Sequence, residues 1–103
     1  MSQRKAAVEV DESGEVPVIR IRGQFDFLLN SAFREAYRKF PSDSRFVLDM
    51  ADVEAIDSSA LGMLLMLREY AGNDPARVIL RHLNEDVRRV LELSNFDRLF
   101  TLE

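Results

Sequence analysis

The chain has 103 residues, of which 47% are hydrophobic, and this size supports one domain with a single core of modest thickness. Its 18 acidic residues outnumber the 14 basic ones and give a formal net charge of -4, a balance that disfavours a nucleic-acid-binding surface. The absence of cysteine excludes disulfides, thiol nucleophiles and thiolate metal sites.

The first half of the chain is predicted to form a hairpin and then a helix. Residues 6–10 and 16–22 alternate like strands, and the segment 23–26 is expected to end the second of them. In that second strand Arg20 and Arg22 share one face, which should be in water. A helix is expected over 29–40, with a buried face formed by Leu29, Phe33, Ala36, Tyr37 and Phe40.

The second half alternates short apolar runs with helical patterns. The strand-like runs are 46–48, 78–80 and 99–102, and the helix-like segments are 61–71 and 85–93, the latter with Asn84 as a suitable N-cap. The resulting order, β-β-α-β-α-β-α-β, predicts an α/β fold. We expect a single domain over 1–103, with a mixed sheet of four to five strands and about three main helices packed on it.

The segment 56–62, Ile-Asp-Ser-Ser-Ala-Leu-Gly, opens the longest of these helices. Asp57 is a good N-cap, which places Ser58 and Ser59 in the first helical turn. A helix start also presents unpaired N–H groups and a positive dipole end, so a serine there is well placed to carry a phosphate. The residues alone leave both roles open, and capping is the commoner one.

The helix that begins at Ser58 is expected to have two different faces. At 100° per residue one side, formed by Ala60, Leu64, Leu67 and Ala71, should pack on the sheet, and the opposite side is formed by Ser58, Gly62, Leu65, Met66 and Glu69. Leu65 and Met66 are either covered by another helix of the domain or exposed as a docking patch. Phe27 and Leu28 either lead into the first helix or extend that patch.

Signals for an enzyme are weak. The only histidine, His82, follows a different strand from the serines, and the sequence around Ser58 lacks the glycines of a nucleophile elbow. The acidic stretch formed by Asp49, Asp52, Glu54 and Asp57 does not have the spacing of a calcium loop. We therefore expect no catalytic residue, no metal and no cofactor, and nucleotide binding near the acidic stretch remains a minor alternative.

We expect a protein of the cytoplasm, because the sequence shows neither a signal peptide nor a membrane-spanning segment. Residues 1–9 lack the apolar stretch of a signal peptide, and the longest apolar run, 63–67, is too short to span a bilayer. No repeat or linker indicates a second domain. We expect a monomer or a weak dimer that does not associate with membranes.

Three segments together resemble the STAS domain of anti-sigma factor antagonists: 23–26 (Gly-Gln-Phe-Asp), 47–50 (Val-Leu-Asp-Met) and 56–62. The resemblance implies a bacterial partner-switching protein, in which a serine kinase that is often also the anti-sigma factor phosphorylates the first serine after the aspartate. A PP2C-type phosphatase removes the phosphate. On this basis Ser58 is the expected acceptor, with Ser59 as second choice.

The same resemblance assigns Asp57 and Asp26 as neighbours of the phosphorylation site. The expected partner-binding residues are Ser59, Gly62, Leu65, Met66, Phe27 and Leu28. Two positions depart from the family pattern, which most often has glycine at Ala60 and glutamate at Gln24. The family also includes accessory subunits of lipid-transport ABC systems, and such a non-switching subunit is the alternative function.

Overall fold

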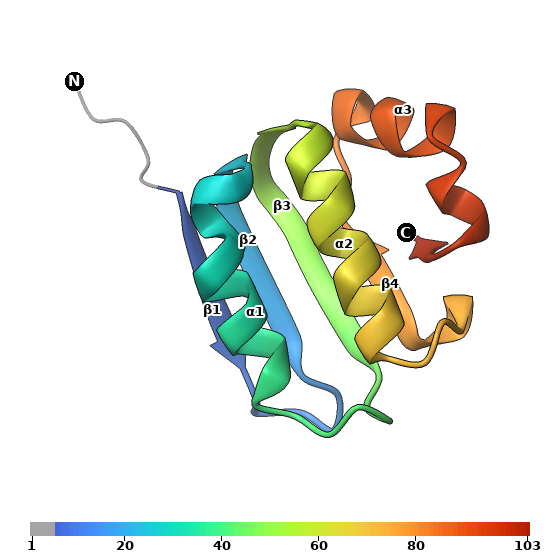
Figure 1. Ribbon diagram of the computed structural model, residues 1–103. Helices are drawn as coiled ribbons and strands as arrows, with labels where there is room; N and C mark the ends of the chain where they lie inside the picture. The colour runs from blue at the N-terminus through green and yellow to red at the C-terminus, as the bar shows by residue number, and fades with distance from the viewer. Residues whose placement is uncertain (1–5) are drawn as a thin grey trace.

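The computed structural model describes residues 6–103, which form one mixed sheet of five strands with helices on one face (Figure 1). The strands are β1 (Ala7–Asp11), β2 (Val18–Phe25), β3 (Phe46–Ile56), β4 (Val78–Arg81) and β5 (Thr101–Leu102). The helices are α1 (Asn30–Arg38), α2 (Ser58–Tyr70) and α3 (Glu85–Leu93), with 3₁₀ turns η1 (Phe27–Leu29), η2 (Pro75–Arg77) and η3 (Phe96–Arg98). The predicted α/β fold and its element order are confirmed.

The sheet topology brings the ends of two strands together. The strands are ordered β1-β2-β3-β4-β5, with β1 antiparallel to β2 and every other neighbouring pair parallel. In the register of β2 and β3, Phe25 is paired with Ile56. The residues that follow these strands, Asp26 and Asp57, therefore leave the sheet side by side at the carboxyl edge, where ligand sites of α/β sheets commonly form.

The core lies between the sheet and the helices α1 and α2, which Figure 1 shows side by side across it. The two predicted helix faces are the ones that pack inward, with Leu29, Phe33, Ala36, Tyr37, Ala60, Leu64, Leu67 and Ala71 all buried and Phe40 partly buried. The ring of Phe33 contacts those of Phe25 and Tyr37 edge to face, with both centroid distances at 5.4 Å. The helical periodicity of the sequence is thus sufficient to orient α1 and α2.

The third helix is tied to the sheet through its cap. Asn84 accepts a hydrogen bond from the Val87 amide at 2.8 Å and donates one to the Val53 carbonyl at 3.0 Å. The predicted cap is confirmed, and it fixes the start of α3 against β3. None of the helices within residues 6–103 combines the length and apolar character that crossing a bilayer requires.

Several predicted boundaries differ from the structure. The segment 23–26 does not end the second strand, because β2 continues through Gly23 to Phe25, and β3 has 11 residues where only 46–48 was expected. Polar residues interrupt the strand pattern of β3, but its pairing with β2 continues past two register shifts, the second between Gly23 and Gln24. Helix α1 is shorter than 29–40, and η3 occupies the chain just before the short β5. The first five residues of the expected domain lie outside the described residues.

The other face of the sheet is in water and its charges are paired. Arg20 lies 3.7 Å from Asp11 and 3.5 Å from Asp49, and Arg22 forms an ion pair with Glu9. The predicted wet face of β2 is confirmed. Exposed pairs of this kind add little stability individually, so they mark where the sheet meets water.

Replacing Gly23 with alanine is expected to destabilise the domain. Gly23 has φ +83°, and an added Cβ would lie 3.0 Å from the Cα of Ala6 on the neighbouring strand region. Strain of this kind costs about 1–3 kcal/mol. Urea unfolding of Gly23→Ala measures it, with Gly14→Ala as the control because nothing lies within 4 Å of a Cβ there. Equal unfolding midpoints for the two variants would contradict the expectation.

Candidate functional site

The N-terminus of α2 is closed by Asp57. Its carboxylate accepts hydrogen bonds from the Ala60 amide at 3.1 Å and from the Ser59 hydroxyl at 2.6 Å. These bonds hold the pKa of Asp57 below its ordinary value, and the bond from the Ser59 hydroxyl has the largest effect. The predicted cap is confirmed, and Asp57 is an ionised carboxylate at neutral pH.

The two serines of the motif have different surroundings. Ser59 is half-buried and its hydroxyl is committed to Asp57. Ser58 is exposed, and its hydroxyl makes no hydrogen bond within residues 6–103. Of the two hydroxyls, the one on Ser58 is therefore the one that is free to react with another molecule.

Replacing Ser59 with alanine is expected to raise the pKa of Asp57. The pKa of Asp57 in the folded protein is lower than the ordinary value of 3.8. The ionised carboxylate therefore stabilises the fold above pH 3.8, and this stabilisation is lost as the pH falls from 3.8 through the folded-state pKa. Without the Ser59 hydroxyl, this stabilisation should be smaller, and its loss should be complete at a higher pH. A carbonyl-detected NMR titration of Asp57 measures the change. Ser58→Ala is the control, and an unaltered pKa in Ser59→Ala would show that the hydroxyl does not stabilise the carboxylate.

Asp26 reaches the same edge of the sheet from β2. It caps η1 by accepting a hydrogen bond from the Leu28 amide at 3.0 Å, and the pairing of Phe25 with Ile56 sets it beside Asp57. The structure therefore brings together the two aspartates that the sequence analysis placed near Ser58. The two carboxylates make the edge of the sheet at which α2 starts locally acidic.

The side of α2 that starts at Ser58 is in water. We call Ser58, Gly62, Leu65, Met66 and Glu69 the outer face of α2; all five are exposed. The large apolar side chains here and in the adjoining η1 are Leu65, Met66, Phe27 and Leu28, with 40%, 56%, 66% and 90% of their surface exposed. The possibility that another helix of the domain covers Leu65 and Met66 is wrong.

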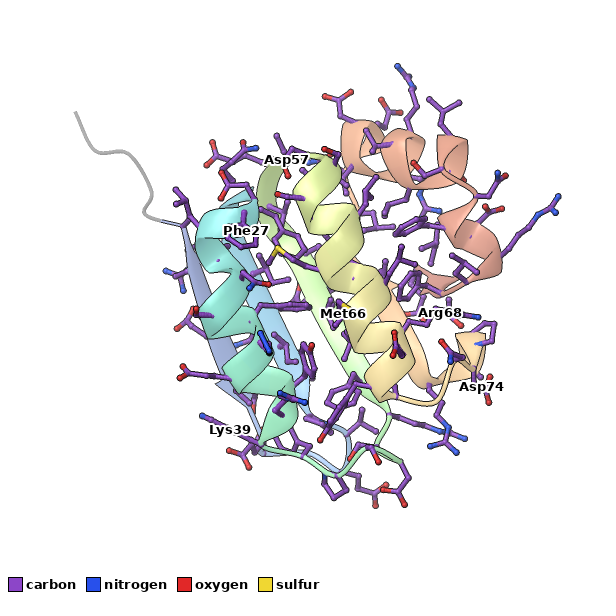
Figure 2. All side chains as sticks on the ribbon, in the orientation of Figure 1. Phe27, Lys39, Asp57, Met66, Arg68 and Asp74 are labelled. Carbon is purple, nitrogen blue, oxygen red and sulfur yellow. The ribbon has the colours of Figure 1, made fainter. Side chains whose placement is uncertain are left out.

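Figure 2 shows how this surface is laid out, with Asp57 at the start of α2, Met66 farther along the same helix and Phe27 beside the start of α1. Because η1 packs against α2, its apolar residues lie next to the helix that Ser58 opens. Phe27 and Leu28 thus do both things that the sequence left open: they lead into α1 and they extend the apolar surface. The result is a hydroxyl flanked by exposed apolar side chains.

Gly62 lies one turn after Ser58 and has no structural need to be glycine. It is inside α2 and exposed, and a Cβ built on it would meet nothing within 4 Å. Glycine inside a helix costs about 1 kcal/mol relative to alanine. No contact within the described residues therefore explains why a residue that weakens the helix stands at this position.

The other candidate groups do not converge on Ser58. His82 Nδ1 lies 3.0 Å from Asp49 on β3. Burial raises the pKa of Asp49, but hydrogen bonds from His82 and from the Ala51 amide outweigh this effect and lower it overall. Within residues 6–103, no group of three or more histidine or acidic side chains is arranged to hold a metal ion.

A groove between α1 and α2 was not foreseen from the sequence. It has a volume of about 200 Å³ and is lined by Arg34, Tyr37, Arg38, Met66, Glu69 and Tyr70. The i,i+4 spacing of Arg34 and Arg38 is a signal for it, because like charges at this spacing disfavour an isolated helix. The sequence analysis assigned no role to these arginines.

Residues 8–102 match the family model described as MlaB, STAS domain, and the chain therefore belongs to the STAS domain family. It is 41% identical over 90 residues to a STAS-domain-containing protein of Pseudomonas aeruginosa, an alignment that covers 86% of this chain and 89% of that protein. It is 32% identical over 75 residues to a putative anti-sigma factor antagonist of Thermotoga maritima, covering 73% of this chain and 58% of that protein.

Solved structures agree on the fold. An anti-sigma factor antagonist from Mycobacterium paratuberculosis superposes with a TM-score of 0.80 at 24% identity, over 95% of this chain and 85% of that one. Unphosphorylated SpoIIAA gives 0.76 at 20% identity, over 94% and 88% of the chains. Phosphorylated SpoIIAA from Bacillus gives 0.65 at 18% identity, over 94% and 91%. The chain is a STAS domain protein that resembles anti-sigma factor antagonists.

Proposed function

We propose that this protein is an anti-sigma factor antagonist that binds an anti-sigma factor with serine-kinase activity while Ser58 is unmodified. Phosphorylation of Ser58 releases the partner, and a PP2C-type phosphatase restores binding. The observation that carries the proposal is the free Ser58 hydroxyl at the start of a helix whose outer face is exposed and apolar. Such a switch would operate in the cytoplasm, where the kinase has ATP.

The proposed switch is electrostatic. A phosphate adds a charge of about -1.5 to -2 beside the carboxylates of Asp57 and Asp26. The positive end of the α2 dipole favours that charge inside the domain. A partner that packs over Ser58 would have to strip water from the phosphate, which costs free energy unless the partner supplies matching donors. We therefore expect release of the partner without refolding of the domain.

The relatives support this proposal. One similar protein is a putative anti-sigma factor antagonist, and the fold of this chain superposes on SpoIIAA both without and with its phosphate. In that protein, therefore, the fold is compatible with both states.

Phosphate mapping tests the proposed acceptor. We expect incubation with ATP and the partner serine kinase to place one phosphate on Ser58, as located by tandem mass spectrometry. Ser58→Ala should remain unmodified, whereas Ser59→Ala should still accept phosphate because its loss leaves the Ser58 hydroxyl in place. Phosphate on Ser59 in the unaltered protein, or none on either serine, would overturn the assignment.

The MlaB description of the matching family model supports a second candidate, a non-switching accessory subunit of a lipid-transport ABC system. In that function the outer face of α2 would be a permanent contact with another subunit. Co-purification separates the two candidates. Stable recovery with a permease or ATPase, unaltered in Ser58→Asp, supports the subunit, whereas recovery with a kinase that Ser58→Asp abolishes supports the switch.

A further inference from the structure

We propose that the groove between α1 and α2 binds the acidic side of an amphipathic helix of the partner protein. The inference rests on the proposed function, because it specifies the chemistry of the partner that lies on the outer face of α2. Met66 belongs both to this face and to the groove, so the two surfaces are continuous. The groove would determine the charge of the partner, and Ser58 would determine when it binds.

Contacts between neighbouring side chains fix the residues that line the groove. The Arg38 guanidinium lies 6.0 Å from the centroid of the Tyr70 ring, in cation–π range. The Tyr70 hydroxyl donates a hydrogen bond to the Phe40 carbonyl, and its ring packs 5.2 Å from that of Tyr37. These contacts hold the Tyr70 ring and the Arg38 guanidinium in place in the lining of the groove.

The arginines that line the groove are Arg34 and Arg38. Within residues 6–103, neither Arg34 nor Arg38 forms an ion pair. This holds although Glu35 is on the same helix, α1, and Glu69 of α2 also lines the groove. Two like charges one turn apart weaken α1. The arginines of the open sheet face are paired instead, as Arg81 is with Glu103 at 3.1 Å. Unpaired guanidinium groups on a chain with a net charge of -4 indicate a complementary acidic partner.

The shape of the surface favours a helix over a membrane. Eight residues separate Ser58 from Met66, a distance of about 12 Å along α2, which about two turns of a partner helix would cover. Apolar side chains beside charged ones match the two sides of an amphipathic helix. An anionic membrane is instead attracted by clusters of about four to eight basic residues, and the groove contains only Arg34 and Arg38.

An acidic partner also explains the direction of the proposed switch. Phosphate on Ser58 would place negative charge at one end of the surface on which an acidic helix lies. The phosphate would then repel the partner directly in addition to resisting desolvation. A basic partner would be attracted by the same phosphate.

The test uses two labelled synthetic helices of about 18 residues. Both carry leucines at i, i+3, i+4 and i+7, and the flanking positions are glutamate in one and lysine in the other. Binding is followed by fluorescence anisotropy at an ionic strength of about 0.15 M, where charges act over about 8 Å, so that the side chains of the groove and not the net charge of the chain decide the result. We expect the glutamate helix to bind about tenfold more tightly than the lysine helix.

The double variant Arg34→Gln/Arg38→Gln should bind the glutamate helix about fivefold to tenfold more weakly, and Arg45→Gln, outside the groove, should bind as the unaltered protein does. An equal or stronger affinity for the lysine helix, no effect of the double variant, or no saturable binding up to about 1 mM would overturn the proposal. Binding to vesicles of phosphatidylglycerol that the double variant abolishes, without binding of either helix, would assign the groove to a membrane instead. The assay does not involve Ser58, so its failure leaves the phosphate-mapping result intact, and the reverse also holds.

Discussion

Replacing Ser58 with aspartate is expected to weaken binding of the kinase partner more than a hundredfold. The new carboxylate lies beside Asp57 and Asp26, on the exposed surface that the partner would cover. A loss of about 3 kcal/mol of binding free energy corresponds to that factor. Ser58→Ala should bind as the unaltered protein does, because it removes a hydroxyl that makes no bond within residues 6–103. Isothermal titration calorimetry with the purified partner measures both affinities.

The same substitution should leave the stability of the domain nearly unaltered. An acidic residue in the first turn of a helix gains about 0.3–1 kcal/mol from the dipole, and the neighbouring carboxylates offset part of this gain. Ser42→Asp is the matched control, since Ser42 is an exposed serine in the loop between α1 and β3 and does not belong to the outer face of α2. If Ser58→Asp binds as tightly as Ser42→Asp does, charge at position 58 does not control the partner.

Enlarging Gly62 is expected to affect stability and binding in opposite directions. Gly62→Ala and Gly62→Leu introduce good helix formers where no atom lies within 4 Å, so the unfolding free energy should rise by about 0.5–1 kcal/mol in both. A partner that packs closely on the backbone would meet the new side chain, and overpacking costs about 1–3 kcal/mol. Affinity should therefore fall a fewfold for alanine and about tenfold or more for leucine.

Urea unfolding and calorimetry on this series separate a structural glycine from a docking glycine. A fall in stability would mean that the fold needs Gly62, in conflict with the open space around it. A rise in stability with unaltered affinity would mean that the partner does not cover this turn of α2. Arg89→Leu controls for added apolar surface, because Arg89 is exposed on α3 and outside the outer face of α2.

The helices of this protein were largely predictable from its sequence. Apolar spacing identified both faces of α2 and the buried side of α1, and Asp57 and Asn84 marked two helix starts correctly. These features depend on residues three and four positions apart, which the sequence displays directly. The position of the candidate site at the start of α2 followed from the same local pattern.

The lengths of β2 and β3 depended on pairing between distant segments. Polar residues such as Asp52 and Glu54 hide the strand character of the later part of β3, and its partner β2 continues beyond Gly23 through a register shift. An L-residue at the φ of Gly23 would be strained, and Ala6 lies so close that a Cβ there would also be crowded. Neither restriction can be read from the sequence. Strand pairing is a tertiary property, and sequence spacing does not contain it.

Three features of the candidate site also required the structure itself. The choice between Ser58 and Ser59 depends on which hydroxyl bonds to Asp57, and both serines are compatible with the sequence pattern. The exposure of Leu65 depends on where the other helices pack. The groove that contains Arg34 exists only because α1 and α2 lie side by side. Each of these features adds chemical detail to a site that the sequence could locate but not describe.

The most direct test of the proposed switch is the dissociation constant of the partner for protein that is fully phosphorylated on Ser58. Intact mass confirms the modification, and calorimetry compares this protein with the unmodified one in the same buffer. The proposed switch predicts an affinity at least a hundredfold weaker for the phosphorylated protein, a loss of about 3 kcal/mol. Equal affinities for the two forms would contradict it, because the charge on Ser58 would then have no control over the surface of the helix that this residue begins.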